Sequence, residues 1–438
     1  MSKSTVLPQF KIEFKPAADP LAVVNFPNVR FSMLTERLVR LEYSPVEDSF
    51  EDRPSQAFWY RQQPVPTFEV KRSSEGIEIS TSFLRLVYTP GPAGLNGFAR
   101  QTLSIEVFAT GHTWRFGDRD HANLGGTTRT LDKIDGSLPL ERGLMSRQGW
   151  AMVDDSKSLV FNEECWVQPR QHPENQDLYF FGHGHDYLAV LDDFIRVSGP
   201  IPLIPRWALG NWWSRFWPYT QAEYLQLMQE FQDHAIPLTV GVIDMDWHIT
   251  RTFDNESTGW TGYTWNRDLF PNPDAFLKEL HGLGLKTSLN IHPAEGIHPH
   301  EQQYPEMARQ MAMDPQRKEA VPFDIADPAF TRAYFEVLHH PQEELGVDFW
   351  WIDWQQGGHC TIPGLDPLYW LNHLHYYDLA RDGRRRPFIF SRWPGLGGHR
   401  YPIGFSGDTK ITWASLAFQP YFTATASNVA YAWWSHDI

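Results

Sequence analysis

Apolar and polar positions alternate with a period of two along the first two hundred residues of the chain. The clearest alternating runs are residues 37–43, 76–80 and 82–88. Two stretches, 90–97 and 111–120, are rich in glycine, proline and polar residues and are typical of turns. A period of two buries one face of a strand and leaves the other in solvent. The pattern therefore predicts an antiparallel β-sandwich domain over residues 1–200.

The rhythm changes after the proline-rich stretch 199–205, where strand, loop and helix begin to alternate. Helical patterns cover residues 222–235 and 274–285. Apolar strands are expected at 208–215, 238–244, 286–292, 347–353, 387–392, 402–408 and 431–437. Strands that alternate with helices form a parallel sheet. We predict a (β/α)8 barrel domain over residues 201–438, incomplete here with about seven strands. No G-x-G-x-x-G turn follows a strand, which weighs against a dinucleotide-binding fold.

Six of the expected barrel strands end in a polar or charged residue. Barrel enzymes place their catalytic groups at the carboxyl ends of the strands, where the loops converge. One such residue could instead cap the next helix, and for Asp353, in the stretch FWWIDWQQG, both interpretations start level. Capping does not plausibly explain all six, so the pattern favours a converging active site. The six residues are Asp244, His292, Asp353, Arg392, Asp408 and Asp437.

Asp353 and Asp408 suggest a reaction that uses a pair of carboxylates. Glycoside hydrolysis needs one ionised carboxylate at the anomeric carbon and one protonated carboxyl beside the leaving oxygen. A neighbouring Arg392 would keep the pKa of Asp353 low, and nearby carboxylates would raise the pKa of Asp408. The abundant tryptophans, 19 in all, suit the C–H faces of sugars as well as a protein core.

Several motifs in order along the chain resemble family 31 of the glycoside hydrolases, the α-glucosidase and α-xylosidase group. In the first half the matching motifs are RLVRLEY (37–43), FEDRPSQ (50–56) and NLGGT (123–127). In the second half they are PRWALGN (205–211), IDMDW (243–247), WID (351–353), SR (391–392) and SGDT (406–409). The resemblance runs along nearly the whole chain.

The resemblance implies a retaining mechanism that acts on α-glucosides or related α-linked oligosaccharides. Asp353 matches the nucleophile and Asp408 matches the general acid/base. The other positions that match or approach the sugar site are Asp244, Arg392, Trp351, Trp354, Phe216, Phe405, His292 and Asp437. The resemblance leaves two alternatives open: an α-glucosyltransferase that uses the same covalent intermediate, and a carbohydrate-binding protein that has lost catalysis.

The chain departs from the family pattern at two places. Gln355 and Gln356 follow the nucleophile position where Asn and Glu are commonest. The sequence also stops at Ile438, inside a motif that continues in the family. We therefore expect a C-terminally truncated fragment that is inactive when expressed alone.

Bulk composition excludes several classes of partner. A formal net charge of −15 over 438 residues argues against a nucleic-acid partner. No apolar run reaches the roughly 20 residues of a membrane span, and no signal peptide is seen, so a cytoplasmic location is expected. The histidine pairs His183/His185 and His298/His300 lack the pattern of a zinc site. We expect no metal and no other cofactor.

Overall fold

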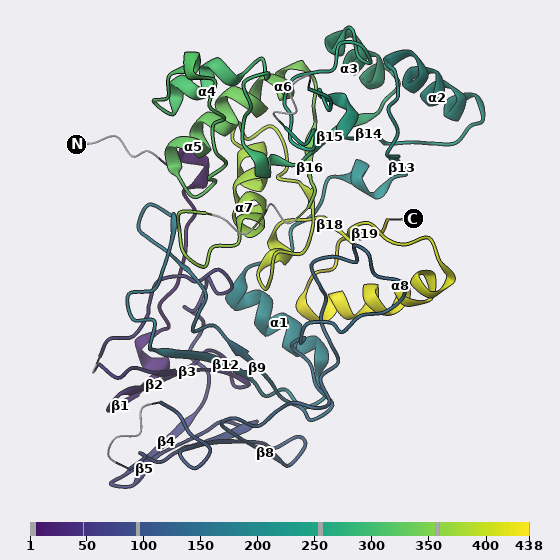
Figure 1. The fold of residues 1–438 in the computed structure, drawn as a ribbon. Helices are drawn as coiled ribbons and strands as arrows, with labels where there is room; N and C mark the ends of the chain where they lie inside the picture. The colour runs from purple at the N-terminus through teal and green to yellow at the C-terminus, as the bar shows by residue number, and fades with distance from the viewer. Residues whose placement is uncertain are drawn as a thin grey trace.

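The computed structural model describes residues 6–46, 48–92, 97–252, 257–354, 357 and 360–437. Its first half contains two five-stranded antiparallel sheets (Figure 1). The first sheet has the order β1 (Val23–Phe26), β2 (Val29–Met33), β3 (Leu38–Tyr43), β12 (Gln176–Phe181) and β9 (Ala151–Asp154). The second has β4 (Glu69–Ser73), β5 (Gly76–Ser80), β6 (Leu84–Tyr88), β7 (Leu103–Val107) and β8 (His112–Arg115) in sequence order. A short hairpin joins β10 (Val160–Phe161) to β11 (Val167–Gln168).

The two sheets contribute side chains to one hydrophobic core. Phe31 and Leu41 of the first sheet lie in the same buried cluster as Ile79 and Leu86 of the second. The predicted strands at 76–80 and 82–88 are present, and β6 alternates between buried and more accessible positions as expected. The turn-like interpretation of 111–120 was wrong for His112–Arg115, which forms β8 and pairs with β7, although turns flank this strand at Gly111 and at Phe116 and Gly117. The side chain of Trp114 supplies an inward-facing apolar group there.

An all-β interpretation of the first half was also incomplete, because helix α1 (Tyr187–Ser198) follows the last strand. The Asp186 side chain accepts a hydrogen bond from the Ala189 N–H and caps this helix. Phe194 and Val197 on α1 pack in a cluster that also includes Val429, which follows helix α8 (Trp413–Ala426). Helix α1 thus lies between the antiparallel sheets and the second half of the chain (Figure 1).

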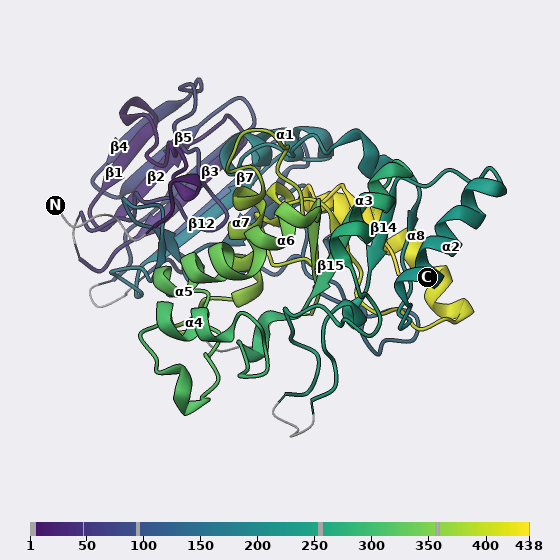
Figure 2. The ribbon, with the colours of Figure 1, turned by 90° about the horizontal axis from the view of Figure 1, so that it is seen from above.

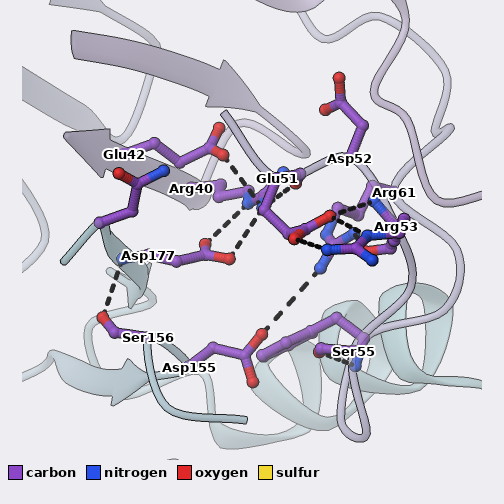
Figure 3. A network of polar contacts seen from close by, with 12 residues as sticks. Arg40, Glu42, Glu51, Asp52, Arg53, Ser55, Arg61, Asp155, Ser156 and Asp177 are labelled. Atoms are coloured by element: carbon purple, nitrogen blue, oxygen red, sulfur yellow. Dashed lines mark hydrogen bonds and ion pairs between the residues drawn. The ribbon is translucent and has the colours of Figure 1, made fainter. Parts of the chain in front are cut away.

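Strand β3 does not have the solvated face that its alternation predicted, since all six of its residues are buried. Arg40 donates from Nε and Nη2 to the two carboxylate oxygens of Asp177, each at 2.8 Å (Figure 3). Arg40 Nη2 also lies 3.0 Å from Oε1 of Glu42. Asp155 extends this ion cluster to Arg61, which lies in a neighbouring loop. Arg40 and Glu42 of the motif at 37–43 are therefore buried in an ion cluster rather than facing solvent.

In the described part of the second half, seven parallel strands form one sheet, ordered as in the sequence from β13 to β19. They are β13 (Trp212–Trp213), β14 (Val240–Ile243), β15 (Lys286–Ile291), β16 (Phe349–Ile352), β17 (Phe390–Ser391), β18 (Gly404–Phe405) and β19 (Trp434–Ser435). Each lies inside a predicted range, so the prediction of seven strands is confirmed. The observed strands are shorter than the predicted ranges.

Helices lie between the parallel strands along the chain and cover the outside of their sheet (Figure 2). They are α2 (Gln221–Asp233), α3 (Pro273–Gly282), α4 (Tyr304–Gln310), α5 (Pro328–Ala333), α6 (His340–Leu345), α7 (Pro367–Leu379) and α8 (Trp413–Ala426). A π-helical turn, Tyr334–His339, connects α5 to α6. Both predicted helices are present as α2 and α3. No helix in the described parts of the chain combines the length and apolar character needed to cross a membrane.

Candidate active site

Strand β16 carries Asp353 into a buried position at its carboxyl end. The four strand residues before it are buried, and the Asp353 N–H donates to the Ile291 carbonyl of β15 at 3.1 Å. The next residue, Trp354, has a left-handed backbone (φ 57°) and donates its N–H to Asp353 Oδ1 at 2.7 Å. Such a conformation is uncommon outside glycine and often marks a functional site. The turn after β16 therefore holds the carboxylate firmly.

Arg392, which follows β17, is fully buried and pairs with Asp353. Its Nη2 lies 2.7 Å and its Nε 3.1 Å from Oδ1 of Asp353. The guanidinium also lies over the ring of Phe405, 5.2 Å from the ring centre. A buried cation needs compensating charge, and the carboxylate of Asp353 supplies part of it.

Asp408 approaches the same guanidinium from the loop after β18. Its Oδ1 lies 3.8 Å from Nη2 of Arg392. The same nitrogen lies 2.7 Å from Oδ1 of Asp353. These two distances add to 6.5 Å, so the two carboxylate oxygens lie no farther apart than that. The Asp408 side chain is 72% exposed, whereas Asp353 is buried. One carboxylate thus lies at the floor of the site and the other at its mouth.

The two carboxyls have pKa values shifted in opposite directions. Burial acts to raise the pKa of Asp353, but hydrogen bonding to His292 and the charge of Arg392 outweigh it and hold the pKa well below its usual range. Partial desolvation, followed by the negative charges of Asp353 and Asp132, raises the pKa of Asp408 to about 6. Solvent screens the charges around the exposed Asp408. Carboxyls with opposed shifts in one site are the arrangement that acid–base pairs use.

Asp244 follows β14 and both caps a helical turn and lies near the active site, two roles that the sequence analysis treated as alternatives. Its Oδ1 accepts a hydrogen bond from the Met245 N–H at 2.7 Å, at the start of the 3-10 turn Met245–Trp247. Burial, and then the charge of Asp353, raise its pKa to about 6. It is therefore a helix cap that also lies in the electrostatic field of the Asp353 site.

The second half of the chain is matched by a sequence model of known proteins. The model is described as the glycosyl hydrolases family 31 TIM-barrel domain, and it matches residues 201–438. The chain belongs to glycosyl hydrolase family 31. The seven parallel strands are therefore part of a TIM-barrel domain, as the sequence predicted.

Curated relatives of this family 31 chain are distant and longer. An α-xylosidase of Saccharolobus solfataricus is 24% identical over 336 residues, which cover 68% of this chain and 42% of the relative. "Alpha-glucosidase 2" of Bacillus thermoamyloliquefaciens is 24% identical over 273 residues, 55% of this chain and 33% of the relative. The chain thus spans less than half the length of these relatives.

Solved structures of the family share the fold over nearly all of this chain. A family 31 α-xylosidase from a soil metagenome, complexed with xylose, superposes with a TM-score of 0.67 at 15% identity. That match covers 95% of this chain and 71% of the α-xylosidase chain. A family 31 dextranase of Flavobacterium johnsoniae, complexed with glucose, gives 0.69 at 16% identity, with 98% and 61% covered.

His292 and two tryptophans form one wall beside Asp353. His292 Nε2 lies 3.3 Å from Asp353 Oδ2, and the ring of Trp354 lies 4.6 Å from the imidazole. Trp260 packs on Trp354 at 4.4 Å and on His292 at 5.4 Å and remains 37% exposed. Trp260 was not anticipated from the sequence, because it lies in a loop without periodicity.

The remaining predicted residues differ in how closely they approach the carboxylates. Trp351 and Phe405 are buried and pack on each other at 5.1 Å, so they form the floor of the site. Asp437 accepts from the Thr409 N–H at 2.9 Å and adds negative charge near Asp408. Phe216 is 67% exposed, and the described contacts that link the other residues do not include it.

The sequence interpretation missed two polar residues that lie against the carboxylates. Asn290 donates from Nδ2 to Asp353 Oδ2 at 3.3 Å, from β15. Asp132, from the first half of the chain, accepts from Arg392 Nη1 at 2.6 Å. Asn290 could have been suspected as a polar residue in a buried strand. Gln355 and Gln356 lie outside the described residues.

The histidine pairs have ordinary polar partners rather than a shared metal geometry. His183 Nε2 lies 2.9 Å from Asp193 Oδ2, and His185 Nε2 lies 2.9 Å from the Arg147 carbonyl. His300 Nε2 lies 3.3 Å from Glu301 Oε1. Within the described ranges, no group of three or more His, Cys, Asp or Glu residues gathers as metal ligands.

Proposed function

We propose that the protein is a retaining α-glycosidase in which Asp353 is the nucleophile and Asp408 the general acid/base. One observation carries this proposal: a single nitrogen, Arg392 Nη2, pairs with both carboxylates, so the Oδ1 atoms of Asp353 and Asp408 lie no more than 6.5 Å apart. Retaining enzymes place their carboxylates about 5–5.5 Å apart, and inverting enzymes about 6.5–9.5 Å apart. The upper limit on the distance between the two Oδ1 atoms does not exceed the shortest separation in inverting enzymes, which favours retention.

The first step forms a bond between Asp353 and the anomeric carbon. The bond from that carbon to the glycosidic oxygen breaks, its electron pair goes to the oxygen, and Asp408 gives that oxygen a proton. In the second step the Asp408 carboxylate takes a proton from water, whose oxygen bonds to the anomeric carbon. The ester bond to Asp353 then breaks, and both carboxyls return to their starting states.

The charge distribution supports these roles. Asp353 is ionised at neutral pH because its pKa is lowered, as attack requires. Asp408, whose pKa is raised to about 6, can hold a proton closer to neutrality than an ordinary aspartate and, unlike the partly buried Asp244, is exposed at the mouth of the site. Activity should therefore decline above roughly the pKa of Asp408, because the acid loses its proton there.

The aromatic wall beside Asp353 suits a sugar ring. Trp260 and Trp354 present apolar faces of the kind that pack on sugar C–H groups. α-Glucosides and related α-linked oligosaccharides are the proposed substrates. α-Xylosides are tested beside them, because curated relatives include α-xylosidases. We also propose that residues 1–200 form a β-sandwich domain, since both antiparallel sheets share one core.

The test uses the full-length protein with aryl α-glucosides and α-xylosides. Wild-type enzyme should release the α-anomer of the sugar first, as measured by NMR during the reaction. Asp353→Asn should lower turnover by at least about 10⁴-fold while substrate still binds. Initial release of the β-anomer would contradict a retaining mechanism. New oligosaccharides at high substrate concentration would show that a sugar hydroxyl can replace water in the second step.

A further inference from the structure

A short arm from the first half of the chain, residues 129–132, lies directly against the loop that carries Asp408. The Leu131 N–H donates to the Ser406 carbonyl at 2.8 Å. The Leu131 side chain is buried in a cluster with Phe418 and Phe422 of α8. The arm is thus fixed by a backbone hydrogen bond on one side and by apolar packing on the other.

The arm fits closely because residue 407 is glycine. Gly407 has a left-handed backbone (φ 81°), and a Cβ added there would lie 2.2 Å from Arg392 Nη1 and 2.6 Å from Asp132 Oδ1. Both are far shorter than a van der Waals contact. Lack of a side chain at 407 therefore allows Asp132 and Arg392 to meet beside the Asp408 loop.

One oxygen of Asp132 links the Arg392 guanidinium to the backbone of Asp408. Oδ1 accepts from Arg392 Nη1 at 2.6 Å and from the backbone N–H of Asp408 at 2.8 Å. Thr130 of the same arm also accepts a hydrogen bond from Arg392 Nη1. The carboxylate of Asp132 therefore fixes the backbone of Asp408 and shares the guanidinium that also pairs with the Asp408 side chain.

We propose that Asp132 is a positioning residue for the general acid: it holds the Asp408 loop in place and neutralises Arg392, so that Asp408 keeps its proton. This inference rests on the proposed glycosidase function. It assigns a role in the chemistry of the barrel site to a residue of the first half of the chain.

The charges around Asp408 determine in which direction its pKa moves when Asp132 loses its charge. The groups that act on it are Asp353, Asp132 and Asp437, which disfavour its ionisation, and Arg392, which favours it. Burial acts to raise the pKa of Asp132, but the hydrogen bond and charge of Arg392 lower it below its usual range, so Asp132 is an anion at neutral pH. Removing that anion leaves Asp353 and Asp408 as the charged partners of Arg392. The balance at Asp408 then moves toward the ionised form.

The experiment compares Asp132→Asn, Asp132→Glu and wild type in the full-length protein. Asn keeps the size and an acceptor oxygen but removes the charge, and Glu keeps the charge. Asp135→Asn is the control, because Asp135 lies in the same segment and accepts from Thr412 Oγ1 at 2.6 Å. Each variant is assayed on a nitrophenyl and a methyl α-glycoside over a range of pH, and its thermal melt is recorded.

For Asp132→Asn, we expect the alkaline limb of kcat/KM to move to lower pH. We also expect kcat/KM to fall about 10- to 100-fold on the methyl glycoside, which needs proton donation, and less than about threefold on the nitrophenyl glycoside. Asp132→Glu should keep the wild-type pH limb, and Asp135→Asn should match wild type in both assays.

Two results would overturn the inference while leaving the proposed function in place. One is an active wild type whose Asp132→Asn variant keeps the same pH limb and the same ratio between the two substrates. The other is an equal loss on both substrates with a lowered melting temperature, which would show a purely structural role. A wild type that cleaves no α-glycoside would overturn the proposed function and this inference together.

Discussion

The imidazole Nε2 of His292 lies 3.3 Å from Oδ2 of Asp353, on the carboxylate oxygen that Arg392 does not contact. Asp353 is therefore held through both oxygens, by a histidine on one and a guanidinium on the other. Ionised carboxylates are favoured by such donors. This contact leads to a prediction about the acidic side of the pH profile.

Replacing His292 with Ala should raise the pKa of Asp353, because one donor to its charged form is lost. Asp353 must be ionised to attack, so its lowered pKa supports activity at mildly acidic pH. The acidic limb of kcat/KM should accordingly move to higher pH in His292→Ala, while the alkaline limb stays in place. The pH profile on an aryl α-glycoside measures both limbs, and an unmoved acidic limb would show that His292 does not act on Asp353.

Asp408→Ala should separate substrates by the quality of their leaving group. Proton donation contributes about 10²–10⁴-fold for poor leaving groups and little for activated ones. We expect that range of loss on a methyl α-glycoside and a much smaller loss on a dinitrophenyl glycoside. The alkaline limb near the pKa of Asp408, about 6, should also disappear. Equal losses on both substrates would mean that another group is the acid.

Removing one partner from the buried ion cluster of the first half should strongly destabilise its sheet. Asp177 pairs with Arg40 and with Arg170, and its carboxylate is buried. Asp177→Ala leaves two buried cations without this partner and should cost about 3–5 kcal/mol in the free energy of unfolding. Urea denaturation of the full-length protein measures the change. Glu78→Ala, which removes an exposed pair with Lys71, is the control and should shift the urea midpoint little.

Trp260→Ala should weaken substrate binding more than it slows the chemical step. Its ring packs on Trp354 and contacts no carboxylate in the described structure. Loss of one aromatic contact is worth about 0.5–1.5 kcal/mol, so KM should rise about two- to tenfold with kcat nearly unchanged. Trp260→Phe should recover part of the binding. A large fall in kcat with unchanged KM would point instead to a role in orienting His292.

The sequence predicted the parallel sheet better than the ends of its strands. Each buried strand appears as an apolar run, but regular hydrogen bonding begins and ends within that run. Residues 208–215, for example, overlap the end of the 3-10 turn Arg206–Leu209 and include only Trp212–Trp213 as β13. Periodicity shows which residues avoid water, whereas strand bounds depend on pairing with neighbours that are distant in sequence.

The site could be predicted where its residues directly follow an apolar strand, as Asp353 and Arg392 do. Asp132 and Trp260 could not, because they lie in loops and their positions depend on packing between distant segments. Arg40 and Glu42 show a related limit. They alternate with apolar residues as surface residues would, yet they are buried because their charges are compensated: Arg40 pairs with Asp177 from another strand and with Glu42, and Glu42 also pairs with Arg30.

The contact between Asp132 and Arg392 joins residues 260 positions apart. A ribosome that synthesises this chain exposes the carboxylate long before it delivers the guanidinium. Catalytic competence would then appear only as a late event of biosynthesis, and a nascent chain arrested before residue 392 could not have it.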